Sequence, residues 1–146
     1  MHITYKGDYA LKTILDLALH YGESPVTIHD LSKQADIPTK FLEQILLDLK
    51  RGGFVESRRG KVGGYFLARA PAKIRLGEVI RFIDGPIEPI ACVDNRYKDC
   101  SDMSRCIFKG IWRNVTEATS KIIDGVTFED LAKKARKSDS ALSYQI

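Results

Sequence analysis

The three cysteines of this chain lie together in one polar segment, with the spacing C-x7-C-x5-C. Cys92, Cys100 and Cys106 are separated by the residues VDNRYKD and SDMSR, which offer little apolar surface to fold around. Thiolates bind iron–sulfur clusters and zinc, and metal–thiolate bonds can order such a loop. An odd number of thiols argues against a closed disulfide framework. The spacing favours an iron–sulfur cluster and leaves open a thiol redox switch, a zinc site or no shared site.

The composition is typical of one compact unit. The chain has 146 residues, of which 44% are hydrophobic and 29% are charged, and this length can bury roughly two thirds of the unfolded surface. The start, MHITYKGDYALK, lacks the apolar stretch of a signal peptide. No run reaches the ~18 apolar residues that a membrane helix requires. We therefore expect a cytoplasmic protein without a membrane partner.

The first fifty residues predict three helices. Apolar residues recur at helical spacing over about 6–21, and Thr27 followed by Asp30 resembles a capping box that opens a short helix through Ala35. Pro38 suits the start of a third helix at about 39–51, which Gly52 and Gly53 end. A short helix, a tight turn and a longer helix indicate a helix-turn-helix.

The third predicted helix has two faces. Its apolar side chains are expected in the core: Phe41, Leu42, Ile45, Leu46 and Leu49. Its polar side chains gather toward the N-terminus, where a recognition helix meets base edges. We assign DNA contact to Thr39, Lys40, Glu43, Gln44 and Lys50. The alternative is the solvated face of an ordinary helix.

A basic hairpin follows this helix. Residues 54–57 and 65–67 are expected to pair as strands around the turn RRGKVGG, and the stretch from Lys50 to Arg69 holds six basic residues and one acidic residue. Such local charge is typical of a phosphate-binding surface. The hairpin is therefore expected to be the wing of a winged helix, although an ordinary surface turn remains the alternative. Its predicted DNA contacts are Arg58, Arg59, Lys61, Gly63, Gly64 and Tyr65.

The second half of the chain predicts a long exposed helix. After a short helix that ends before Gly85, helical spacing extends over about 103–124, which corresponds to ~33 Å. We expect its apolar face to pack against the same helix of a second subunit, the alternative being packing on its own chain. That face carries Ile107, Ile111, Val115, Ala118 and Ile122. A short helix to Ala135 follows.

These elements predict a mainly α fold with a small β-hairpin wing. It combines a winged helix-turn-helix with a long dimerisation helix. The expected parts are a DNA-binding domain at 1–70, a cysteine loop with its dimerisation helix at 71–135, and a mobile tail at 136–146.

Four stretches of the chain are similar to the Rrf-type family of dimeric winged-helix transcription regulators. They are ITYKGDYAL, FLEQILLDL, VESRRGKVGGYFL and GEVI, and the likeness covers roughly residues 1–130. The resemblance implies that Cys92, Cys100 and Cys106 hold an iron–sulfur cluster, with 4Fe-4S favoured over 2Fe-2S. It also implies that Glu43 reads a base and that Arg59 enters the minor groove.

The fourth cluster ligand differs among members of this family. IscR-like members have a histidine three residues after the last cysteine, where this chain has Lys109. NsrR-like members use an aspartate near the start of the first helix, donated by the partner subunit. Asp8 stands in the matching place and is our candidate fourth ligand. The alternative is that Asp8 stabilises the positive N-terminus of its helix.

The expected function is a dimeric transcription regulator, a repressor, that binds double-stranded promoter DNA. Its cysteines are expected to sense nitric oxide, redox state or iron–sulfur supply. No enzyme is expected, because the chain shows no nucleotide-binding glycine fingerprint, metalloprotease histidine pair or nucleophile–base arrangement. Alternatives are a cluster-free thiol-switch regulator, a redox or electron-transfer protein and a regulatory interaction module. The basic hairpin favours DNA over the last two.

Overall fold

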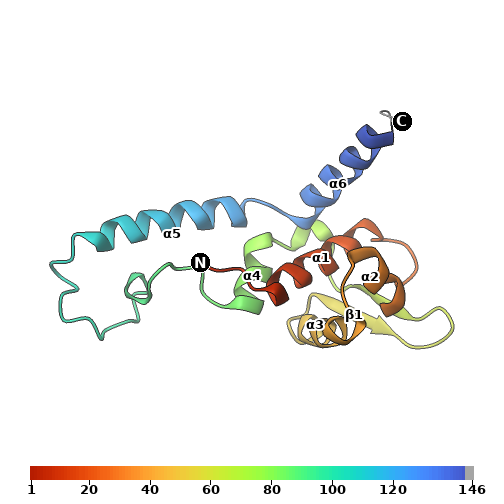
Figure 1. Ribbon diagram of the computed structural model, residues 1–146, viewed down its shortest axis with the longest axis horizontal. Helices are drawn as coiled ribbons and strands as arrows, with labels where there is room; N and C mark the ends of the chain where they lie inside the picture. The colour runs from red at the N-terminus through yellow and green to blue at the C-terminus, as the bar shows by residue number, and fades with distance from the viewer. Residues whose placement is uncertain (144–146) are drawn as a thin grey trace.

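The structure is a computed structural model that describes residues 1–143. Over this range the chain is mainly helical with one antiparallel hairpin, as expected (Figure 1). The elements in chain order are α1 (Tyr5–Leu19), α2 (Ile28–Ala35), α3 (Thr39–Arg51), β1 (Val55–Arg58), β2 (Gly64–Leu67), η1 (Pro71–Lys73), α4 (Leu76–Asp84), η2 (Ala91–Val93), α5 (Phe108–Asp124) and α6 (Phe128–Ser143).

The helix α1 is the centre of the core and contacts α2, α3, α4, α6 and β2. Its N-cap Thr4 accepts a hydrogen bond from the Gly7 amide at 3.0 Å, which satisfies a free donor of the first turn. The apolar side chains of α1 are buried against these five elements, and this burial favours folding. The fully buried large side chains around it include Leu31, Leu42, Leu46, Leu49, Phe54 and Phe128.

The helix-turn-helix forms as predicted. Thr27 caps α2 by accepting a hydrogen bond from the Asp30 amide at 3.2 Å. Asp36 ends α2 in the left-handed region, with φ of 52°. The Ser32 hydroxyl then donates to the Ile37 carbonyl at 2.6 Å and fixes the turn into α3. The bounds of α3, Thr39–Arg51, agree with the predicted helix.

The helix α5 is joined to the body near its C-terminal end. Ile123 packs with Ile80 and Ile87 in a second small apolar cluster. Arg81 donates to the Asp124 carboxylate at 2.6 and 2.9 Å. The helix begins at Phe108, five residues later than the predicted start near Met103, because residues 101–105 form turns instead.

The helix α6 extends further than predicted. It continues past Ala135 to Ser143, so the segment expected to be a mobile tail is helical as far as the structure describes it. Arg136 donates to the Leu19 carbonyl at the end of α1, at 3.1 Å, and ties this part of α6 to the body. The last part of the predicted tail, residues 144–146, lies outside the described residues.

The cysteine loop and the wing lie at opposite ends of the molecule (Figure 1). The winged helix occupies one end, and α5 extends away from it toward the cysteine loop. Within residues 1–143, no helix is both long and apolar enough to cross a membrane.

Candidate nucleic-acid interface and cysteine loop

The outward face of α3 is polar near its N-terminus. Leu42, Ile45, Leu46 and Leu49 are buried and fix the rotation of the helix. The five predicted contact residues Thr39, Lys40, Glu43, Gln44 and Lys50 are all exposed. Across the described residues, the side chains of Lys40 and Glu43 make neither hydrogen bonds nor ion pairs with the protein. Both are therefore available to a ligand.

Three of these α3 residues are held by the protein itself. The Thr39 hydroxyl donates to the Ser32 hydroxyl at 3.2 Å. The Gln44 amide donates to Asp48 at 3.3 Å. The Lys50 ammonium donates to the Ser57 hydroxyl of β1 at 2.7 Å, which ties α3 to the wing. These contacts position the helix, and a DNA contact by the same groups would have to share or exchange them.

The prediction that Phe41 lies in the core is wrong. Its side chain is 63% exposed and lines an apolar hollow of about 490 Å³ between α1 and α3. Tyr5, also exposed, and Tyr9 line the same hollow. Four aliphatic residues of α3 already occupy the face that is buried in the core. Phe41 therefore lies at the edge of this face, where its ring is exposed. Leu47, which is 44% exposed, is a second apolar residue on the surface of α3 that the sequence pattern did not single out.

The wing is a short hairpin with exposed cations near its tip. Arg58, Arg59 and Lys61 are all exposed, as predicted. The Arg58 guanidinium lies 5.7 Å from the centre of the Phe66 ring, a cation–π contact that orients it. The strands pair in register from Val55 opposite Leu67 to Arg58 opposite Gly64. The hairpin therefore presents three positive charges on a rigid base.

Gly63 and Gly64 act inside the wing. A side-chain carbon on Gly63 would lie 2.5 Å from the Arg58 carbonyl, and one on Gly64 would lie 2.5 Å from the Val26 carbonyl. This close approach lets Tyr65 and Val26 exchange two backbone hydrogen bonds, at 2.7 and 2.9 Å. Both glycines are half-buried. Their observed contacts thus explain how the wing joins the body.

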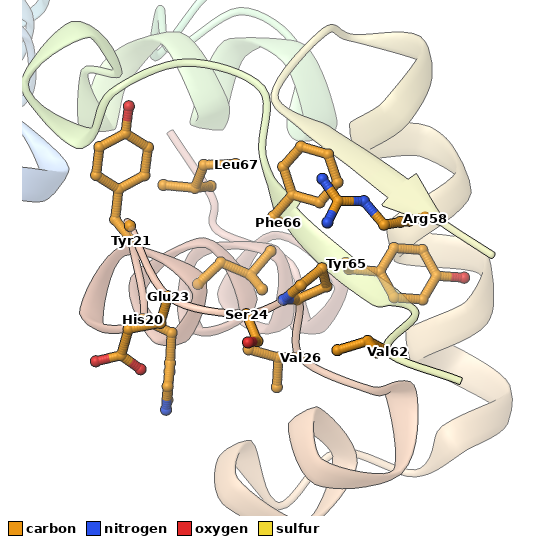
Figure 2. A pocket seen from close by; sticks show the side chains of 13 residues that line it. His20, Tyr21, Glu23, Ser24, Val26, Arg58, Val62, Tyr65, Phe66 and Leu67 are labelled. Carbon is orange, nitrogen blue, oxygen red and sulfur yellow. The ribbon is translucent and has the colours of Figure 1, made fainter. Parts of the chain in front are cut away.

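A hollow of about 870 Å³ separates the wing from the loop after α1 (Figure 2). Its lining includes His20, Glu23 and Ser24 on one side and Arg58, Tyr65 and Phe66 on the other. The predicted DNA contact Tyr65 is half-buried here. The wing is thus attached to the body through the backbone hydrogen bonds between Tyr65 and Val26. The hollow remains open between the wing and the loop after α1.

The three cysteines are free thiols, and each is half-buried. Cys92 lies in η2, and Cys100 and Cys106 lie in the polar segment before α5. Arg96 donates hydrogen bonds to Asp94 from its side chain and its amide, and these lower the pKa of the Asp94 carboxyl to about 2. Among residues 1–143, no three His, Cys, Asp or Glu side chains are arranged to hold a metal ion. Cysteine thiols are suitable ligands for an iron–sulfur cluster, but in this structure the three thiols are not grouped around a common position.

Asp8 lies in the first turn of α1, where it pairs with Lys12 at 2.7 Å. Its hydrogen bond and charge raise the pKa of the Lys12 ammonium. The Asp8 side chain is 47% exposed and is not grouped with the cysteines of its own chain. A ligand role for Asp8 would therefore require the loop of a second chain.

One face of α5 is uncovered. The predicted contact residues Ile107, Ile111, Val115, Ala118 and Ile122 are all exposed or half-exposed. Ile107 is the N-cap rather than a helical residue and is 80% exposed. Phe108 and Trp112, which the sequence pattern did not single out, are 57% and 36% exposed and extend the same apolar face. Their spacing of four residues was the signal that could have identified them.

The chain resembles known regulators over nearly its whole length. The model of the Rrf2 family, described as an iron-dependent transcriptional regulator, matches residues 3–134. An rrf2-like HTH-type transcriptional regulator of Rhodobacter capsulatus is 40% identical over 136 residues, which cover 88% of this chain and 91% of the relative. CymR (YrzC), the global cysteine regulator of B. subtilis, has a similar structure, with a TM-score of 0.76 and 31% identity over 92% of this chain and 98% of CymR. T. potens IscR also has a TM-score of 0.76, with 30% identity over 94% of this chain and 90% of IscR.

Proposed function

Because the chain belongs to the Rrf2 family of transcriptional regulators, we propose that it is a dimeric repressor that binds promoter DNA and senses nitric oxide, redox state or iron–sulfur supply. Like these relatives, it is a regulator and not an enzyme. The observation that carries the proposal is the position of the three free thiols. They share one loop between a winged helix and a helix whose apolar face is uncovered. Such a regulator acts on DNA in the cytoplasm.

DNA reading is assigned to α3 and the wing. Lys40 and Glu43 project from the N-terminal half of α3, and a carboxylate there can accept a hydrogen bond from a cytosine amino group. The wing cations Arg58, Arg59 and Lys61 suit phosphates or a narrow minor groove. Thr39, Gln44 and Lys50 support this surface through their contacts with Ser32, Asp48 and Ser57.

Removing the wing cations should weaken the salt dependence of DNA binding. We expect the variant with Arg58, Arg59 and Lys61 all changed to alanine to lower the log–log salt slope by about 0.9 for each phosphate that the wing no longer neutralises. Fluorescence anisotropy with promoter DNA over a range of KCl concentrations measures this slope. Lys133→Ala on α6 is the matched control and should keep the wild-type slope. An unchanged slope in the wing variant would contradict the assignment.

Dimerisation is assigned to α5. The large apolar side chains on its exposed face would remain in water in a monomer, and a second copy of the same helix offers a complementary surface. Two winged helices held in this way would read a pseudo-palindromic site.

The cluster is assigned to Cys92, Cys100 and Cys106, with Asp8 of the partner subunit as the fourth ligand. All three thiols are free and lie on one polar segment, and 4Fe-4S is favoured over 2Fe-2S. The cluster would supply a redox-active and nitric-oxide-reactive centre. A carboxylate is a harder ligand than a thiolate, so the Asp8 bond to iron is expected to be the most labile of the four.

The visible absorption spectrum of protein purified without oxygen tests the cluster. We expect a brown protein with iron and sulfide contents near stoichiometric. A colourless protein, even after anaerobic reconstitution with iron and sulfide, would contradict the cluster and leave the DNA-binding assignment standing.

A thiol switch without a cluster is the second candidate. The observation that favours it is that the three half-buried thiols are free and, within residues 1–143, not gathered around a metal position. The likeness to CymR, which is described as a global cysteine regulator, is compatible with such chemistry. A colourless protein whose DNA affinity changes on reversible thiol oxidation would support this candidate.

A further inference from the structure

The loop that carries the cysteines and the surface that reads DNA are far apart within one chain (Figure 1). A signal that begins at the loop therefore requires a physical connection to α3. The first turn of α1 lies between the two regions. It is hydrogen-bonded to the last residue of α4, from which the loop departs, and ion-paired with α3.

The base of the loop is tied to α1 by Asp84. This residue ends α4, and it precedes Gly85, whose φ of 84° turns the chain toward the cysteines. The Asp84 carboxylate accepts hydrogen bonds from both the Thr4 amide, at 3.0 Å, and the Thr4 hydroxyl, at 2.5 Å. A side-chain carbon on Gly7 would collide with Asp84 Oδ2, so this approach requires glycine at position 7.

The same turn of α1 is tied to the recognition helix by Lys6. Its ammonium lies 2.6 Å from Asp48 on α3, and the Asp48 side chain is only 16% exposed. The hydrogen bond from Lys6 lowers the pKa of the Asp48 carboxyl, so the pair stays ionised at neutral pH. Asp48 also accepts from the side-chain amide of Gln44, one of the predicted DNA contacts. A shift of the first turn of α1 would therefore act on Asp48 and, through it, on Gln44 of α3.

We propose that the first turn of α1 couples the cysteine loop to DNA reading, with Asp84 and Asp48 as the positioning residues at its two ends. This inference rests on the proposed function, because it assigns the route by which the state of the loop changes DNA affinity. The route runs from Asp84 to Thr4, along the turn to Lys6, and from Lys6 to Asp48. It lies within one chain and uses neither Asp8 nor the cysteines as connecting groups.

The test is the ratio of two dissociation constants for promoter DNA, one for the cluster-loaded protein and one for the cluster-free protein. In the wild type we expect a ratio that differs from one by roughly 5- to 150-fold, the usual range for coupled sites. Asp84→Asn and Asp48→Asn should each bring the ratio close to one while iron and sulfide contents stay at the wild-type level. Glu129→Gln, which removes an exposed ion pair with Lys133 on α6, is the control and should keep the ratio.

A merely structural role of Asp84 predicts a different result. Both dissociation constants would then shift by the same factor, the ratio would stay at its wild-type value, and the proposal would be overturned. Substitutions at Thr4 provide a second check that spares both aspartates. Thr4→Ser keeps the hydroxyl and should keep the ratio, whereas Thr4→Val removes the hydroxyl and should reduce the ratio.

Failure of the proposed function can be recognised separately. If the wild type holds no cluster, the loop can still be perturbed by labelling its cysteines with N-ethylmaleimide. We then expect labelling to change amide hydrogen exchange in α3 of the wild type and to leave it unchanged in Asp84→Asn. An α3 whose exchange does not respond to labelling in the wild type would overturn the coupling route.

Discussion

The substitution Ile111→Asp is expected to convert the protein into a monomer. Ile111 lies on the uncovered face of α5, in the first turn of the helix, and is 54% exposed in the single chain. In a symmetric dimer the change occurs twice, and each new carboxylate would be buried without a partner at a cost of several kcal/mol. We expect the dimer dissociation constant to rise by at least about 100-fold, since ~1.4 kcal/mol corresponds to a factor of ten. Sedimentation equilibrium measures this change directly.

Loss of the dimer should also weaken promoter binding. Two linked winged helices gain roughly 10²- to 10⁴-fold in avidity from their connection, and monomers forfeit this gain. Arg113→Asp is the matched control, because it introduces the same side chain about 200° around the helix from Ile111. It changes the charge by more than Ile111→Asp does, so an intact Arg113→Asp dimer would attribute the effect to the apolar face. A dimeric Ile111→Asp protein would exclude α5 as the dimer interface.

Replacing any one cysteine by serine is expected to remove most of the iron and sulfide from the protein. A serine hydroxyl is a poor substitute for a thiolate, and the loop offers a cluster three thiolates in all, so none can be replaced by another cysteine. We expect Cys100→Ser protein prepared without oxygen to lose its visible absorption while its circular dichroism spectrum stays helical. The folded core lies away from the loop, so stability should change little.

Two further variants show whether the loss is specific to the ligands. Met103→Leu removes the other sulfur atom between Cys92 and Cys106 and should leave the absorption intact. Asp8→Ala should still assemble the cluster from the three thiolates but lose it faster in air, because one ligand position is open. A Cys100→Ser protein that keeps full iron and sulfide, or an Asp8→Ala protein as stable as the wild type, would contradict the corresponding ligand assignment.

Local signals predicted the winged helix well. Thr27 and Asp30 fixed the start of α2, and Pro38 together with the two glycines after Arg51 fixed the limits of α3. Each of these signals acts through hydrogen bonds or backbone angles within a few residues. The local sequence is therefore sufficient to predict where these helices begin and end. The glycine-rich turn of the wing belongs to the same class.

Contacts between distant segments were harder to predict. Phe41 has the helical spacing of a core residue, but the bundle leaves it at the surface beside Tyr5 and Tyr9 of α1. The helix α6 continues beyond Ala135 although its sequence there is polar, and Arg136 is bonded to Leu19 across the chain. The pattern could not show these arrangements, because they depend on how α1 packs against each element.

The candidate site was predicted in its residue types more than in its geometry. The cysteines, the wing cations and the apolar face of α5 are free or exposed as a binding role requires. Hydrogen bonds of Thr39 and Lys50 to neighbouring elements were not foreseen, since their partners Ser32 and Ser57 are seven residues away in sequence. The ligand set and the base contacts remain predictions.

The attachment of α5 has a mechanical consequence. The helix is held near one end by the pair of Arg81 and Asp124 and by Ile123, while its other end carries the cysteine segment. Its 17 residues span about 25 Å, so a tilt of roughly 5° at this pivot would displace the far end by about 2 Å. A small change in packing beside Asp124 would therefore produce a larger displacement at the cysteine end of α5.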